Sequence, residues 1–219
     1  MKILGLNIAS SSVNKNGRGW IDPKTHEFVY LPIEEFATLE RPAPTYQELG
    51  FSDVRYPSLP VHLDPEFKTF TYGHVRRYGD QKLFQMALGD ILFFYSTLDL
   101  LPSHRDWGIY IVGYFTVDYV CDTRRMNVKE IKKLDGFEEN AHMRRVTPGV
   151  HLLVKGTSDS RLYTHAIRLS HPDDNRRLHP DFVGLLATVT GKPLGGAGWH
   201  RWLLYSESVG LAQALRANH

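Results

Sequence analysis

Two neighbouring apolar runs in the middle of the chain give the strongest structural signal. Residues 91–98 read ILFFYSTL, and residues 108–120 read GIYIVGYFTVDYV after a loop that contains Pro102 and Trp107. Both runs are rich in β-branched and aromatic residues, which favour strands. The moderate length of the loop predicts that they are adjacent antiparallel strands in the core.

Weaker patterns predict the elements on either side of this pair. Short apolar runs bounded by turn residues are typical of strands, and apolar residues three and four positions apart are typical of helices. The predicted elements are a strand at 2–8, a returning strand at 27–31 that completes an amino-terminal hairpin, a helix at 79–88 ending at Gly89, a partly helical segment at 127–145, a strand pair at 151–157 and 161–169, and carboxy-terminal helices at 180–190 and 206–217.

The segment from residue 40 to residue 67 has a different character. Its five prolines, Pro42, Pro44, Pro57, Pro60 and Pro65, leave room for little regular structure. The segment also carries aromatic and apolar side chains that favour burial. We therefore expect an ordered, functional loop rather than a linker.

Composition places the chain among ordinary globular proteins. Of its 219 residues, 42% are hydrophobic and 23% are charged, which fits a single α+β domain spanning residues 1–219, with an elaborated region at 40–88 and a helical carboxy-terminal extension. The 26 basic and 24 acidic residues exclude a strongly basic arm. A single cysteine, Cys121, excludes an internal disulfide and favours the cytoplasm. No stretch approaches the roughly 18 apolar residues of a membrane span, so we expect no membrane partner.

The central strands resemble a known superfamily. Gly89-Asp90 enters the run that ends at Tyr95-Ser96, and a second strand follows at Gly108 to Phe115. This pattern is similar to the core of PUA-like proteins, which include the EVE, YTH and ASCH domains. The resemblance implies a PUA-like mixed β-barrel with peripheral helices.

A second resemblance rests on several short motifs that follow in order over residues 1–170. The motifs are Asn7 to Ser12, Phe28 to Glu34, His62-Leu63-Asp64-Pro65-Glu66-Phe67 with Phe70-Thr71-Tyr72-Gly73, Gly89-Asp90, and Asn140-Ala141-His142-Met143-Arg144-Arg145. Together they resemble the nucleotide modification associated domain 3 family, which is found beside DNA base-modification systems. The resemblance implies nucleic acid, DNA with a modified base, and proteins of the modification system as partners, and it supplies no mechanism.

These resemblances suggest a protein that holds a modified or flipped base in a pocket. Stacking of one base on an aromatic ring contributes on the order of 1–3 kcal/mol without reading its identity, so polar groups must supply specificity. We expect Tyr95, Ser96 and Trp107 to hold the base, with Asn7 at a neighbouring strand end. The alternative is that Tyr95 is a core aromatic residue and Trp107 anchors the loop. This base-binding role needs no cofactor.

Phosphate contacts are predicted for Arg144, Arg145, Ser160 and Arg161. An arginine side chain presents a planar fork that matches phosphate oxygens, and a short polar turn can offer backbone N–H groups to an anion. The alternative for the paired arginines is a solvated helix end, where they would form ion pairs with nearby glutamates.

An enzyme acting on a modified nucleobase or nucleotide is the second hypothesis. His62, Asp64 and His142 are then the catalytic residues, either as acid and base or as a two-histidine, one-carboxylate set of the kind that binds iron(II) or zinc. A third hypothesis is a sensor of small nucleotides that never binds a polymer.

Overall fold

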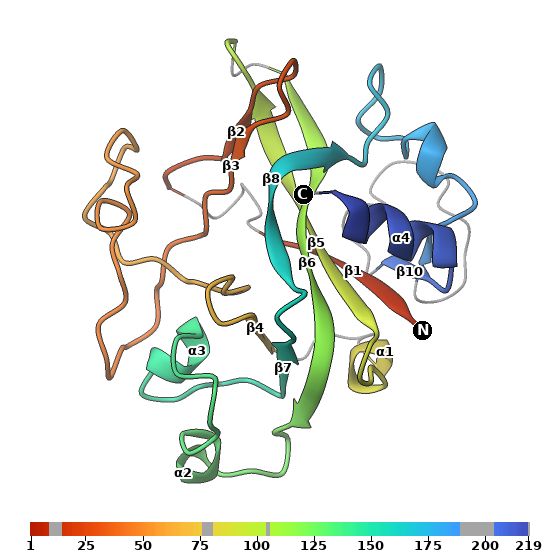
Figure 1. Cartoon of the computed structure of the whole chain (residues 1–219). Helices are drawn as coiled ribbons and strands as arrows, with labels where there is room; N and C mark the ends of the chain where they lie inside the picture. The colour runs from red at the N-terminus through yellow and green to blue at the C-terminus, as the bar shows by residue number, and fades with distance from the viewer. Residues whose placement is uncertain (9–14, 76–80, 104–105, 189–203, 219) are drawn as a thin grey trace.

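The computed structural model describes residues 1–8, 15–75, 81–103, 106–188 and 204–218. Ten strands dominate it, and the helices are short (Figure 1). The strands are β1 Ile3–Asn7, β2 Trp20–Ile21, β3 Phe28–Val29, β4 Thr71–His74, β5 Ile91–Leu100, β6 Trp107–Asp122, β7 Leu152–Gly156, β8 Arg161–Arg168, β9 Ala187–Thr188 and β10 Leu204–Ser206. The helices are α1 Gln81–Phe84, α2 Val128–Ile131, α3 Ala141–Arg144, the 3₁₀ turn η1 Pro180–Phe182, and α4 Val209–Ala217.

The predicted central strand pair is confirmed. β5 and β6 are antiparallel along most of their length, and β1 joins β5 in parallel. Successive side chains of a strand point to opposite faces, so Phe94 belongs to one hydrophobic cluster and Phe93 and Tyr95 to another. Both faces of β5 are therefore buried, which explains why its sequence is continuously apolar rather than alternating.

The described strands form an α+β protein with an open sheet. The sheet follows the path β4-β7-β6-β5-β1-β10-β9, and its end strands β4 and β9 do not pair with each other. The PUA-like resemblance implied a barrel, and within the described residues this expectation is wrong. The chain adds β10 and β9 beyond β1, and so extends the sheet instead of closing it.

Strands β7 and β8 do not pair with each other as predicted. Each pairs with a different part of β6: β7 with its second half and β8 with its first half. Irregularities in β6 accompany both pairings. At one of them a Cβ on Gly113 would lie 2.5 Å from the carbonyl oxygen of Arg161, so only glycine allows β8 to approach this closely.

The helical predictions are confirmed only in part. The helix at 206–217 is α4, and Ser208 caps it by accepting a hydrogen bond from the backbone of Leu211. The helix predicted at 79–88 is the single turn α1, and residues 79–80 lie outside the described residues. The segment predicted as a helix at 180–190 instead contains η1 and β9, while residues 189–190 are also outside the described part.

The predicted returning strand contains β3, but its hairpin partner is β2, across a turn that begins at Asp22. The strand at 2–8 is β1, and it pairs with β5 and β10 rather than joining this hairpin. Each hairpin strand has only two residues, and β2 also pairs in parallel with the end of β5.

The proline-rich segment has its own small hydrophobic cluster. Tyr46 is completely buried at its centre beside Leu31 and Val61, and its hydroxyl donates a hydrogen bond to the carbonyl oxygen of Pro32 over 2.6 Å. In Figure 1 this segment lies on one side of the central strands, and α4 and β10 lie on the other. Apolar packing thus orders a segment that has almost no regular secondary structure.

Among the described residues, no helix combines the length and apolar character that a transmembrane crossing requires.

We predict that Tyr46→Phe lowers the free energy of unfolding by about 1 kcal/mol, because a buried hydrogen bond is lost while the ring remains. Urea denaturation measures the change. Tyr56→Phe is the matched control, since Tyr56 is 39% exposed and its loss of a hydroxyl should change stability by less than about 0.5 kcal/mol. Equal effects of the two substitutions would contradict the anchoring role of Tyr46.

Candidate functional site

Asp64 joins three segments that are distant in sequence. Its Oδ1 accepts hydrogen bonds from the backbone N–H of Gly73 in β4, at 2.7 Å, and from the side-chain amide of Asn140, at 2.9 Å. Asn140 is the N-cap of α3, and its own side-chain oxygen accepts from the backbone N–H of His142. The capping residue therefore fixes both the start of α3 and the orientation of the Asp64 carboxylate.

His142 occupies space that a glycine provides. A Cβ on Gly73 would lie 2.6 Å from Cδ2 of His142, so a larger residue in β4 would force the imidazole to move. The Nδ1 atom of His142 lies 3.1 Å from the carbonyl oxygen of Pro148, and its Nε2 lies 3.3 Å from Oδ2 of Asp64. The ring is thus held by contacts at both nitrogens.

His62 faces the same cluster and is held by a carboxylate. Its Nδ1 lies 2.7 Å from Oε2 of Glu35, and Arg145 contacts both oxygens of this carboxylate at 3.0 and 3.1 Å. Burial opposes ionisation of Glu35, but the hydrogen bonds from His62 and Arg145 outweigh it and lower the pKa of Glu35 to about 2. Glu35 is therefore an anion at neutral pH.

The three residues predicted for an enzymatic centre come together. One nitrogen each from His62 and His142 and a carboxylate oxygen of Asp64 lie within 4.8 Å of one another. The side chains of His62, His142 and Asp64 are 9%, 4% and 6% exposed, respectively. Two imidazoles and one carboxylate at this spacing can exchange protons or hold a metal ion.

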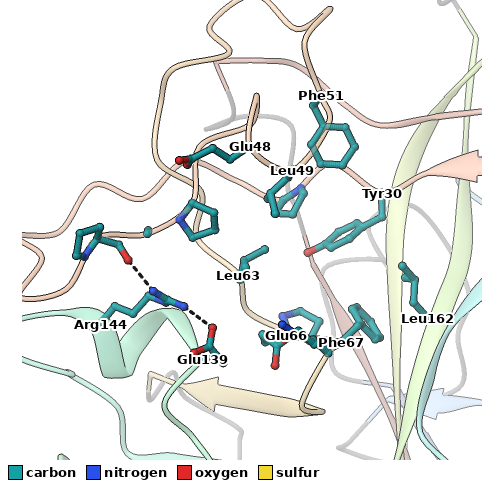
Figure 2. Close-up of a pocket in the computed structure, with 16 residues that line it drawn as sticks. Tyr30, Glu48, Leu49, Phe51, Leu63, Glu66, Phe67, Glu139, Arg144 and Leu162 are labelled. Carbon is teal, nitrogen blue, oxygen red and sulfur yellow. Dashed lines mark hydrogen bonds and ion pairs between the residues drawn. The ribbon is translucent and has the colours of Figure 1, made fainter.

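A pocket of about 590 Å³ lies beside this cluster (Figure 2). Its walls are mostly apolar, with three aromatic rings, four prolines and three leucines, and its polar groups are three carboxylates and two basic side chains. The lining residues are Tyr30, Pro32, Pro42, Ala43, Pro44, Glu48, Leu49, Phe51, Leu63, Pro65, Glu66, Phe67, Lys68, Glu139, Arg144 and Leu162.

Two polar groups of the pocket are Tyr30, whose protonation follows from its burial, and Arg144, whose guanidinium has two partners. Burial, together with the nearby Asp64 carboxylate and Tyr46, raises the pKa of Tyr30, so its hydroxyl stays protonated and can donate a hydrogen bond. Arg144 is held by the carbonyl oxygen of Pro42 at 2.6 Å and by Glu139 at 2.5 Å. Figure 2 shows this ion pair at one end of the pocket and the Tyr30 hydroxyl directed towards Leu63.

The pocket and the cluster share two chain segments. Leu63 and Pro65 line the pocket, whereas His62 and Asp64, which alternate with them, belong to the cluster. The second shared segment is 139–145, where Glu139 and Arg144 line the pocket and His142 belongs to the cluster. None of the three cluster residues lines the pocket.

The residues predicted to bind a base are not gathered in this pocket. Tyr95 is fully buried, its ring centroid lies 6.1 Å from that of Phe93, and it belongs to the core cluster beneath α4. Trp107 lies opposite Asp99, four residues along the strand from Tyr95, which is about 13 Å at roughly 3.3 Å per residue. A base stacked on Tyr95 would have to displace the core.

The other two predicted base contacts lie near Tyr95 in the sheet. Asn7 is exposed and is the register partner of Tyr95 between β1 and β5. Ser96 is 2% exposed, and alternation along β5 turns it to the opposite face from Tyr95.

The four predicted phosphate contacts lie in two places. Arg144 lines the pocket, and Arg145 is engaged by Glu35. Ser160 is buried, and its hydroxyl accepts a hydrogen bond from the backbone of Thr116. Arg161 lies at the start of β8, 5.9 Å from the ring of Tyr114.

Sequence reasoning missed most of the residues that build the site. Glu35 and Phe51 lie outside the motifs described above. Tyr30 and Phe67 lie within motifs of the family resemblance but had no predicted role, and Arg145 was predicted to contact phosphate rather than to pair with Glu35. The available signal was the apolar and aromatic content of the proline-rich segment, which indicates burial but not which side chains meet.

A family model identifies the chain. The model for nucleotide modification associated domain 3 matches residues 2–203, so the chain belongs to that family. No curated protein and no solved structure matches this chain. The family description associates the chain with nucleotide modification, and this agrees with the resemblance carried by the sequence motifs.

We predict that Gly73→Ala destabilises the protein by about 1–3 kcal/mol, because the new methyl group would overlap His142. Urea denaturation measures the loss, and the NMR signals of the His142 ring report its displacement. Gly210→Ala is the control, since its Cβ in α4 would lie 3.7 Å from the hydroxyl oxygen of Ser208, an ordinary contact distance, and alanine favours the helix. A Gly73→Ala protein as stable as wild type would contradict the packing described for His142.

Proposed function

We propose that this chain binds a nucleobase in the pocket between Tyr30, Phe51, Leu63 and Phe67, and that it does so as part of a DNA-modification or defence system. The observation that carries the proposal is an apolar, aromatic pocket with an arginine at one end, in a family associated with nucleotide modification. The ligand would be a modified or flipped base in DNA. The predicted base site therefore moves from Tyr95 to this pocket.

The size and walls of the pocket support this proposal. Sites for small molecules occupy roughly 300–1,000 Å³, and about 590 Å³ falls within that range. Heterocyclic bases gain free energy from contact with aromatic and apolar side chains, whatever their identity. Tyr30 and Phe67 already form an edge-to-face pair with centroids 6.2 Å apart, which gives one wall a fixed shape.

The polar groups of the pocket support recognition of one base over another. The protonated Tyr30 hydroxyl can donate to a carbonyl or ring nitrogen, and the carboxylate of Glu48 can accept from an exocyclic amine. Arg144 is the predicted phosphate contact that lines the pocket. Its ion pair with Glu139 is the interaction that an incoming phosphate would have to replace.

Filling the pocket tests the proposal. We predict that Leu63→Trp lowers affinity for the preferred base at least tenfold, because the larger side chain occupies the space between the aromatic walls. Calorimetric titration with a panel of nucleoside monophosphates, with and without modified bases, and with a single-stranded oligonucleotide measures the affinity. Leu185→Trp is the matched control, since Leu185 is 37% exposed and does not line the pocket.

The outcomes separate the hypotheses. Oligonucleotide binding that weakens steeply with salt supports a reader of nucleic acid, because phosphate contacts release counterions. Binding of mononucleotides alone supports a nucleotide sensor. If no member of the panel binds, or if Leu63→Trp binds as well as Leu185→Trp, then the pocket is not the base site.

An enzyme acting on a modified nucleobase or nucleotide is the second candidate, and the convergence of His62, Asp64 and His142 favours it. We predict that Asp64→Asn abolishes turnover of such a substrate, because the amide keeps an acceptor for Gly73 and Asn140 but loses the charge. Product formation by chromatography is the measurement, with Asp159→Asn at an exposed turn as the control. Unchanged turnover in Asp64→Asn would remove Asp64 from the reaction.

A further inference from the structure

We propose that His62, Asp64 and His142 bind one divalent transition-metal ion. The inference does not depend on base binding in the pocket, because none of the three residues lines that pocket. It rests on the distances within the cluster, on the nitrogen atoms left for a ligand, and on the charge of Asp64.

The distances are close to those of a metal centre. Bonds of about 2.0–2.1 Å to nitrogen and oxygen at tetrahedral angles place neighbouring ligand atoms ~3.3–3.4 Å apart. Nε2 of His142 and Oδ2 of Asp64 are separated by 3.3 Å. The ligand atoms of the three residues all lie within 4.8 Å of one another, so coordination requires side-chain movements of about 1.5 Å or less.

Each histidine is oriented through the nitrogen that a metal would not use. Nδ1 of His62 lies 2.7 Å from the carboxylate of Glu35, and Nδ1 of His142 lies 3.1 Å from the carbonyl oxygen of Pro148. The guanidinium of Arg145 also lies 3.1 Å from each of these two Nδ1 atoms. A metal-bound histidine commonly donates its second N–H to a carboxylate or a backbone carbonyl, which fixes the tautomer and the ring. Here that arrangement leaves Nε2 of both rings for the ion.

Asp64 supplies a buried charge that a cation would balance. Its side chain is 6% exposed, and within the described residues its one ion-pair partner is His142. Gly73 and Asn140, which hold Oδ1, are uncharged donors. The guanidinium of Arg145 forms its ion pair with Glu35, and among the described residues it forms none with Asp64. The hydrogen bonds satisfy Oδ1, and a cation between Oδ2 and the two imidazoles would balance the remaining buried charge.

The donor set selects the class of metal. Two imidazoles with one carboxylate suit zinc, iron(II) and cobalt(II), whereas magnesium and calcium prefer oxygen ligands alone. Three protein ligands leave at least one coordination position for water or substrate. The ion would also tie residues 62–64 to α3, and the same two segments carry Leu63 and Arg144 into the pocket.

Metal titration of the untagged full-length chain, after dialysis against a chelator, tests the inference. We expect one Zn²⁺ per chain with micromolar or tighter affinity by calorimetry, visible absorption of bound Co²⁺ typical of a low-coordinate site, and no response to millimolar Mg²⁺. Asp64→Asn and His142→Gln should each weaken Zn²⁺ binding at least 100-fold, and Glu35→Gln about 10–100-fold through the orientation of His62.

His165→Ala is the matched control, since His165 is an exposed histidine of β8 outside the cluster. It should bind Zn²⁺ as wild type does. The inference is overturned if wild type binds no Zn²⁺, if Asp64→Asn binds as tightly as His165→Ala, or if NMR shows a doubly protonated His142 paired with Asp64 that Zn²⁺ does not displace. The titration contains no nucleotide, so its result is independent of the Leu63→Trp experiment.

Discussion

The carboxylate of Asp64 is the constraint on which the arrangement of the site depends. A buried carboxylate is tolerated only where hydrogen bonds or opposite charge replace water. Asp64 meets this requirement with the backbone of Gly73 and the amide of Asn140, which come from β4 and from the cap of α3. One side chain thereby fixes the proline-rich segment, a strand of the sheet and a short helix relative to one another.

The position of α3 has consequences for both features of the site. Four helical residues have little stability of their own, so tertiary contacts must hold α3 in place. Those contacts set the direction of His142 towards Asp64 and of Arg144 towards the pocket. The cluster and the pocket are therefore two products of the same scaffold, although their lining residues do not overlap.

The central sheet serves a different purpose. β5 lies between β1 and β6 and is covered on both faces, so its aromatic residues stabilise the fold and are not presented to solvent. This accounts for the burial of Tyr95, which the sequence offered as a base-binding residue. The pocket forms instead beside the sheet, where the prolines prevent regular pairing and the chain leaves space between side chains.

The sequence by itself determined the α+β class, the β5–β6 pair, the helix α4 and the family, because each of these depends on local periodicity or on short motifs. It also named His62, Asp64 and His142 as a set, since imidazoles and carboxylates limit the chemistry a protein can perform. Only the tertiary structure decided that these three meet, that Glu35 and Arg145 support them, and that Tyr95 is enclosed. The physical reason is that contacts between residues 27 to 110 positions apart depend on strand pairing and loop packing, for which a single sequence carries no periodic signal.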